Sequence, residues 1–181
     1  MAMISHYELP LPRFDQPPRL LIVVSPYYRE IADGLIAGAR GVAEQVDAIT
    51  DLIEVPGALE IPTAIGMAAR SGRFDGFVAL GCVIRGETTH YETVCNDSSR
   101  GLTLLGLQGH AIGNGILTVE TEDQAIVRAD PIGQNKGGGA AAAALHLIAL
   151  SRRYAPRPDR SEAGDRDPIR LAGRLEGSPN A

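Results

Sequence analysis

Apolar positions recur along this chain with two different periods. Residues 19–25 (RLLIVVS) form a short apolar run rich in β-branched side chains, which is typical of a strand buried on both faces. Downstream, apolar residues return at helical spacing, with charged residues between them, at Ile31, Leu35, Ala39, Val42 and Val46. These two segments predict a buried strand followed by an amphipathic helix.

The same alternation of strand and helix continues to residue 154. Further strands are expected at residues 49–55, 77–84 and 111–119, and further helices at 59–70, 88–107, 123–129 and 140–154. Because strands and helices alternate, the sheet should be parallel and covered by helices on both faces. The pattern predicts an α/β fold, a three-layer αβα sandwich with a four-stranded parallel sheet. Ligands of such sheets bind beyond the carboxyl ends of the strands.

The two ends of the chain lack this pattern. Residues 1–18 contain four prolines and are expected to form an extended arm. Residues 155–181 are rich in Pro, Arg, Asp and Gly and have few large apolar side chains, so we expect a disordered C-terminal tail. One domain, residues 19–154, is therefore expected between these two segments.

Composition narrows the class of protein. The formal net charge of −5 argues against binding to a nucleic-acid backbone. No apolar run is long enough to span a bilayer, and the proline-rich N-terminal segment does not resemble an export signal, so a cytoplasmic location is expected. The two cysteines, Cys82 and Cys95, are then expected to be reduced, and they form no redox motif.

Unusual local sequences occur in segments that we assign to the ends of strands: residues 25–28, 56–62, 85–90 and 114–118. In residues 85–90 (RGETTH), a glycine and two hydroxyl side chains precede a predicted helix whose unpaired N–H groups favour a phosphate or carboxylate. His90 is the only histidine at such a junction, so it is the candidate for proton transfer near neutral pH. As an isolated string, RGETTH fits an ordinary capped helix with a surface histidine equally well.

His90 also opens the string His-Tyr-Glu, which matches the first half of a zinc deaminase signature. The second half of that signature, Pro-Cys-x-x-Cys, is missing from the sequence. No metal ion is therefore expected at this position.

Other residues near these segments have both functional and structural interpretations. Lys136, the only lysine, comes before the last predicted helix, where a bound anion would offset its unfavourable interaction with the helix dipole, although it can equally point into solvent. Arg128 can bind an anion or stabilise the end of its own helix. Glu60 can accept hydrogen bonds from ligand hydroxyls or only favour the start of a helix. Tyr27 and Tyr28 can stack on a planar heterocycle or pack at the surface.

Taken together, the segments resemble the 6,7-dimethyl-8-ribityllumazine synthase family. The resemblance runs from about residue 19 to 154 and rests on VPGALEIP (55–62), LGCVIRGETTHYETVCND (80–97), GILTVETEDQAIVRA (115–129) and NKGGGAAAA (135–143). It implies a flavodoxin-like fold and a transferase of the penultimate step of riboflavin biosynthesis. That reaction condenses 5-amino-6-(D-ribitylamino)uracil with 3,4-dihydroxy-2-butanone 4-phosphate and releases phosphate and water. The resemblance implies no metal and no organic cofactor.

The resemblance also implies a role for each matching residue. His90 would transfer protons during imine formation and phosphate loss, and Lys136 would lie near the site. Tyr27 would stack on the uracil. The remaining substrate contacts would be the ribityl-binding turn at Ala58, Leu59 and Glu60, main-chain groups of Val83 and Ile84, and the phosphate-binding residues Glu87, Thr88 and Arg128.

Three positions depart from the family pattern. Tyr28 follows Tyr27 where an asparagine is usual, and Leu59 and Asn114 stand where phenylalanines are usual. Because Asn114 occupies the position of a family residue near the substrate, the resemblance implies that it also contacts the substrate. The departures concern the residues expected around the ring and not those expected at the phosphate.

The resemblance further implies a homo-oligomer, either a pentamer or a sixty-subunit shell of pentamers, with each site shared between neighbouring copies. The partners would be the two small-molecule substrates, with no nucleic acid and no membrane. Alternative hypotheses are a noncatalytic relative that binds flavin-like ligands or serves as a scaffold, and a generic flavodoxin-like domain that binds a phosphorylated small molecule. Retention of His90, Arg128 and Lys136 together favours the enzyme.

Overall fold

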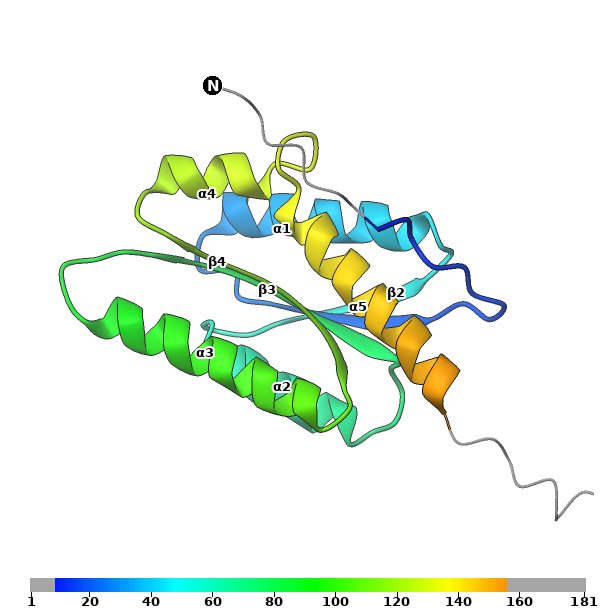
Figure 1. Cartoon of the computed structure of the whole chain (residues 1–181). Coiled ribbons are helices and arrows are strands. Elements are labelled where there is room, and N and C mark those ends of the chain that lie inside the picture. The colour runs from blue at the N-terminus through cyan, green and yellow to red at the C-terminus, as the bar shows by residue number, and fades with distance from the viewer. Residues whose placement is uncertain (1–8, 156–181) are drawn as a thin grey trace, which may run out of the picture.

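The computed structural model describes residues 9–155, which form one sheet with helices on both faces (Figure 1). The sheet has the strand order β2-β1-β3-β4, and every neighbouring pair is parallel. This confirms the predicted α/β fold class. The elements are β1 (Arg19–Val24), α1 (Arg29–Glu44), β2 (Ile49–Glu54), α2 (Glu60–Ala69), β3 (Gly76–Ile84), α3 (His90–Leu107), β4 (Ala111–Val119), α4 (Glu122–Ala129) and α5 (Lys136–Tyr154).

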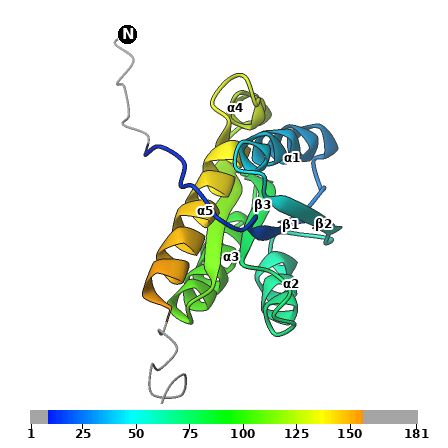
Figure 2. The ribbon, with the colours of Figure 1, turned by 90° about the vertical axis from the view of Figure 1, so that its right-hand side faces the viewer.

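The helices divide into two layers. α1, α4 and α5 cover one face of the sheet, and α2 and α3 cover the other (Figures 1 and 2). Alternate residues of each central strand enter opposite cores, since Leu20 and Ile22 pack with the first layer and Leu21 and Val23 with the second. Burial on both faces explains why β1 is a continuous apolar run.

The last helix begins four residues earlier than the sequence pattern predicted. Lys136 is its first residue, and Asn135, with a φ of 45°, caps it by accepting a hydrogen bond from the Gly138 N–H at 3.0 Å. The prediction placed Gly137 to Gly139 outside the helix because glycine is a poor helix former. Close packing requires the first of these glycines, since a Cβ on Gly137 would lie 2.0 Å from the carbonyl oxygen of Leu35 in α1, whereas one on Gly139 would meet no atom within 4 Å.

Two further boundaries differ from expectation. Residues 114–118 lie inside β4 and form no loop, because that strand pairs with β3 as far as Val119. α3 begins at His90, and neither threonine before it makes the predicted helix cap: the Thr89 side chain caps nothing, and the Thr88 hydroxyl accepts only a long 3.4 Å hydrogen bond from the His90 N–H.

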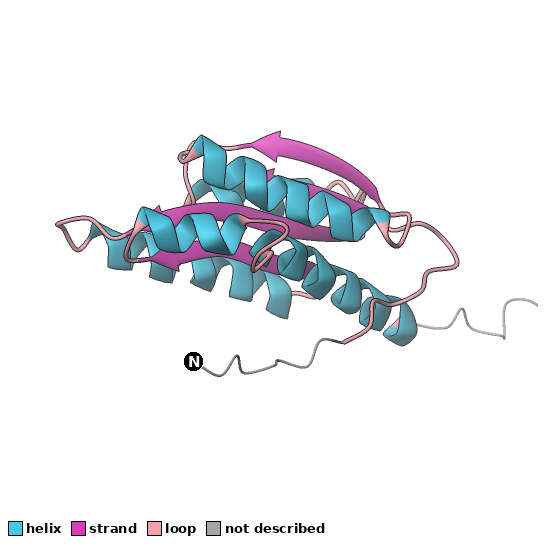
Figure 3. Ribbon diagram, turned by 90° about the horizontal axis from the view of Figure 1, so that it is seen from above, coloured by secondary structure: helices cyan, strands magenta, loops and turns pink. Residues whose placement is uncertain are grey.

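The described part of the N-terminal arm, residues 9–18, contains no helix or strand and passes beside the carboxyl end of α5 (Figure 3). Arg152 of α5 donates a hydrogen bond to the Gln16 carbonyl at 2.7 Å, pairs with Asp75 at 3.4 Å and lies over the Phe14 ring. Residues 1–8 of the predicted arm and residues 156–181 of the predicted tail lie outside the described residues. Between residues 9 and 155, no helix combines the length and apolar character needed to cross a membrane.

The contact between β4 and α5 generates a stability prediction. A Cβ on Gly113 would lie 1.8 Å from the Ala140 carbonyl oxygen, whereas one on Gly41, in the exposed surface of α1, would meet no atom within 4 Å. Gly113→Ala should therefore destabilise the protein by about 1–3 kcal/mol or more through overpacking. Gly41→Ala, the matched control, should stabilise it by roughly 0.5–1 kcal/mol. Thermal unfolding of the two variants checks this, and equal melting temperatures would contradict it.

Candidate active site

A cavity of about 420 Å³ opens at the carboxyl ends of β1 and β3. Parallel strands direct their carboxyl ends to one edge, so the loops that follow β1, β2 and β3 meet there. Its walls come from those loops and from the first turns of α2 and α3. The lining residues are Ser25, Tyr27, Tyr28, Gly57, Ala58, Leu59, Glu60, Cys82, Val83, Ile84, Gly86, Thr88, His90, Tyr91 and Val94.

The register of the sheet leaves one main-chain edge open in this cavity. β1 pairs with β3 only as far as Val24 and Leu80, whereas β3 continues against β4 to Ile84. Beyond Leu80, the β1 side of β3 therefore has no strand beside it in the described chain. The Leu80 carbonyl accepts from the Ser25 N–H on the β1 side, and the Arg85 N–H donates to Val119 on the β4 side. Because the main-chain groups of successive residues alternate between the two sides of a strand, the groups directed to the open side are those of Cys82 and Ile84, and those of Val83 are directed toward β4. Unpaired N–H and C=O groups at a strand end can recognise the hydrogen-bonding edge of a planar heterocycle.

The turn after β2 supplies a second wall. Ala58 is buried, and Glu60 begins α2, where a carboxylate is favoured by the helix dipole. The Glu60 carboxylate lies over the turn, close to Gly57: a Cβ on Gly57 would be only 2.8 Å from Glu60 Oε2. This carboxylate is therefore available at the rim of the cavity as an acceptor for hydroxyl groups.

Tyr27 and Tyr28 form the aromatic side of the cavity. Their rings meet edge to face with centroids 5.1 Å apart, and Tyr27 is 75% exposed. Tyr28 is half-buried and packs against the core under α1, and burial, followed by the nearby Cys82, raises the pKa of its phenol. Tyr27 thus presents an open ring face, while Tyr28 is fixed beneath it.

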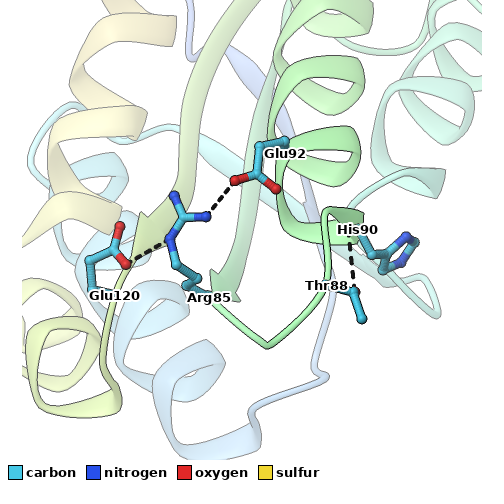
Figure 4. Close-up of polar contacts among 5 residues, drawn as sticks. All are labelled: Arg85, Thr88, His90, Glu92 and Glu120. Atoms are coloured by element: carbon cyan, nitrogen blue, oxygen red, sulfur yellow. Dashed lines mark hydrogen bonds and ion pairs between the residues drawn. The ribbon is translucent and has the colours of Figure 1, made fainter.

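Thr88, on the loop between β3 and α3, and His90, the first residue of α3, both line the cavity. The two residues lie side by side where the loop meets the helix (Figure 4). Both side chains are exposed, and within residues 9–155 the imidazole ring makes no hydrogen bond to another protein group. An imidazole in this position can exchange protons with a ligand in the cavity. Glu87, on the same loop, is exposed and does not line the cavity.

Arg85 opens the predicted anion-binding loop, yet its guanidinium points away from His90 (Figure 4). It pairs with Glu92 and, at 2.7 Å, with Glu120, and it lies 4.1 Å from the centroid of the Tyr91 ring. Its hydrogen bond to Glu92 and then that to Glu120 raise the pKa of Arg85, and the hydrogen bond from Arg85 lowers the pKa of Glu92. No Lys or Arg of the described chain lines the cavity.

The basic side chains that the sequence analysis assigned to the site, Arg128 and Lys136, line a second cavity of about 450 Å³ on the outer edge of the sheet. It is formed by β4, α4 and the start of α5, and it contains Asn114, Arg128 and Lys136. Within residues 9–155 neither Arg128 nor Lys136 forms an ion pair with a carboxylate, although Arg128 donates to the Gln124 carbonyl at 2.9 Å. The two cavities share no lining residue.

The structure thus separates the predicted site residues into two groups. Tyr27, Ala58, Leu59, Glu60, Val83, Ile84, Thr88 and His90 line the first cavity, and Asn114, Arg128 and Lys136 line the second. Residue-level reasoning missed Tyr91 and Val94, although their helical spacing from Thr88 and His90 was a usable signal. It also missed Cys82, whose place in an apolar strand gave no functional signal.

Comparisons with known proteins agree with this geometry. The sequence model of 6,7-dimethyl-8-ribityllumazine synthase matches residues 17–152. The chain belongs to this family. The 6,7-dimethyl-8-ribityllumazine synthase of Jannaschia sp. (strain CCS1) is 60% identical over 154 residues, which are 85% of this chain and 86% of the relative. That of Erythrobacter litoralis is 53% identical over 136 residues, 75% of this chain and 97% of the relative.

Membership of the 6,7-dimethyl-8-ribityllumazine synthase family confirms the resemblance, the flavodoxin-like fold class and the enzyme function in riboflavin biosynthesis that were expected from the sequence. The 6,7-dimethyl-8-ribityllumazine synthase of Bartonella henselae matches as well, at 53% identity over 75% of this chain and 89% of the relative. The generic phosphate-binding domain is thereby a weaker description than the family itself. The roles of individual residues stay predictions.

Cys82 gives a prediction about the state of the cavity wall. Its side chain is buried, and desolvation, followed by the nearby Cys95, raises its pKa to about 11. Only the thiolate is alkylated readily, so at pH 8 iodoacetamide should label Cys82 at least about tenfold more slowly than in the denatured chain. Labelling should accelerate as the pH approaches the raised pKa. Peptide mass spectrometry of both states measures this, and equal rates at pH 8 would refute it.

Proposed function

We propose that this chain condenses 5-amino-6-(D-ribitylamino)uracil with 3,4-dihydroxy-2-butanone 4-phosphate in a site built from the two cavities of neighbouring copies. The main support for this proposal is that the proton-transfer group and the cations lie in different cavities of one copy. The first holds the imidazole of His90, an aromatic face and an open main-chain edge, but no cation. The second holds Arg128 and Lys136 without a carboxylate partner in the described chain.

The pyrimidine binds in the first cavity. Its ring stacks on Tyr27, and its polar edge pairs with the open main-chain groups of Ile84, beside the Val83 side chain that lines the same cavity. Its ribityl chain extends toward Ala58 and Glu60, where the carboxylate accepts hydrogen bonds from hydroxyl groups. Leu59 offers apolar contact in place of an aromatic ring, so less stacking energy comes from this turn.

The phosphorylated butanone lies between the copies. Thr88 of one copy and Arg128 of the next receive the phosphate, and Glu87 lies on the same loop as Thr88. Lys136 adds a second positive charge near the leaving group, and Asn114 lies beside it on β4. A cation donated by a neighbour satisfies the charge that the first cavity lacks, because phosphate in a partly enclosed site requires compensation.

The chemistry then needs little beyond orientation and proton transfer. The amine of the pyrimidine is already a nucleophile, and phosphate is already a leaving group. His90 moves protons as the imine forms and as phosphate departs, and the cations stabilise the charge that collects on the phosphate oxygens. No metal or organic cofactor enters this scheme.

The assembly that this scheme requires is a ring in which each copy offers both cavities to different neighbours. A heterologous contact that closes on itself generates such a ring, and we propose a pentamer, alone or packed into a shell. The exposed β4 edge carrying Asn114 and Thr118 is where the next copy would lie. We propose a cytoplasmic location, since both substrates are small metabolites of the cell interior.

His90→Ala tests the catalytic assignment. With both substrates present, we expect lumazine formation, followed by its fluorescence, to fall about 10²–10⁴-fold, the range of general acid–base catalysis. Affinity for the pyrimidine should change little, because in this scheme Tyr27 and Ile84 hold the ring. A wild-type rate no higher than the uncatalysed rate would leave only the noncatalytic ligand-binding alternative.

Subunit mixing tests whether two copies share each site. His90→Ala and Arg128→Ala should each have low activity, and Arg128→Ala should raise KM mainly for the phosphorylated substrate. Co-expression in equal amounts should restore activity to about a quarter of the sites, the statistical share that has His90 from one copy and Arg128 from the next. Co-expression of His90→Ala with the double variant His90→Ala/Arg128→Ala is the control. Sites confined to one copy would give no recovery in either mixture.

A further inference from the structure

The guanidinium of Arg85 joins three segments that meet beside the His90 loop. Its Nε donates to Glu120 at 2.7 Å, just after β4, and its Nη1 donates to Glu92 in the first turn of α3. Its plane lies over the ring of Tyr91, 4.1 Å from the centroid. The Arg85 N–H also donates to the Val119 carbonyl at 3.0 Å, which continues the β3–β4 ladder by one bond.

We propose that Arg85 is a positioning residue for the lumazine-forming reaction: it fixes the first turn of α3, and with it His90, on the end of the sheet. This inference rests on the proposed function, because it gives Arg85 a role in placing the proton-transfer group. Arg85 itself does not line either cavity.

The loop between β3 and α3 has little else to hold it. Residues 86–90 are exposed, and a Cβ added to Gly86 would touch nothing within 4 Å. Its one side-chain hydrogen bond within the described residues is the 3.4 Å contact between Thr88 and the His90 N–H. The position of His90 therefore depends on the two ends of the loop, and Arg85 ties those ends together through the residues that directly follow His90 (Figure 4).

The same network continues toward the second cavity. The Glu120 N–H donates to the side chain of Gln124 in α4 at 3.0 Å, and the Gln124 carbonyl accepts from Arg128 at 2.9 Å. The contacts of Arg85 thus link the first turn of α3 to the start of α4, while Arg128 itself is held by a bond within its own helix.

A direct role in binding phosphate is disfavoured for Arg85. Its positive charge faces two carboxylates, so the cluster of Arg85, Glu92 and Glu120 carries a net negative charge. An anion approaching this cluster would meet repulsion. Exposed ion pairs also contribute little to stability, so the cluster is better explained by geometry than by folding energy.

Arg85→Met tests the inference, because it keeps an unbranched apolar stem and removes the charge. A misplacement of about 1 Å can lower the rate on the order of 10²-fold, so we expect kcat to fall about 10- to 100-fold. KM for the pyrimidine and affinity for the lumazine product should stay within about twofold, because the wall that binds the ring is intact. Arg85→Lys should recover only part of kcat, since an ammonium lacks the planar fork that reaches both carboxylates.

Arg152→Met is the matched control. Arg152 also contacts a carboxylate, an oxygen acceptor and an aromatic ring, but at the opposite end of the sheet. Melting temperature and assembly size are measured for every variant, so that losses of stability are compared directly. If Arg85→Met does not assemble, Arg85→Lys and Glu120→Gln carry the test with the same readouts.

The outcomes separate this inference from the proposed function. Wild-type turnover with a low His90→Ala rate and a selective loss of kcat in Arg85→Met support the positioning role. Equal kcat in Arg85→Met and Arg152→Met overturns it while leaving the function intact. A rise confined to KM for the phosphorylated substrate would overturn it in favour of direct phosphate binding. Absence of turnover in the wild type would overturn the proposed function, and the positioning role with it.

Discussion

β1 stops pairing with β3 at Val24 and Leu80, and the last residues of β3 continue against β4 alone. This register offset exposes the main-chain edge of β3 at Cys82 and Ile84, and the surrounding loops can then converge on it. If β1 were longer, its own hydrogen bonds would fill the same edge and no planar ligand could use it. The cavity therefore follows from where one strand ends, and the catalytic candidates are arranged around that end.

Neither cavity of one copy holds both a proton-transfer group and a basic side chain. The first has a proton-transfer group and hydrogen-bonding surface, and the guanidinium of Arg85, which lies in sequence between the lining residues Ile84 and Gly86, is engaged by Glu92 and Glu120. The second has Arg128 and Lys136 at an open sheet edge. In the proposed assembly, an anion bound between two such surfaces would satisfy both, so substrate affinity and association of copies would depend on the same electrostatic complementarity.

Small residues determine how closely α5 packs against the sheet and α1 beside the second cavity. Gly113 and Gly137 allow α5 to approach β4 and α1 so closely that a Cβ would collide with a main-chain oxygen. This approach places Lys136 at the first turn of the helix, beside the strand that carries Asn114. The buried small residues of α5, among them Gly137, Ala140 and Ala144, thus pack inside the subunit.

The sequence by itself determined the elements, the parallel sheet and most of the residues around each cavity. It could do so because buried strands, amphipathic helices and turn residues obey local rules of periodicity and backbone geometry. The start of α5 was beyond its reach, since Gly137 packs closely against Leu35 of α1 and Gly138 donates to the Asn135 cap, and no local propensity of glycine predicts these contacts. The direction of the Arg85 side chain was likewise decided by its ion pairs with Glu92 and Glu120. These residues are 7 and 35 positions away in the sequence, so no local pattern shows that they meet Arg85. Which predicted residues share a cavity was decided only by the order of the strands, because β1 and β3 are neighbours at the centre whereas β4 lies at the edge.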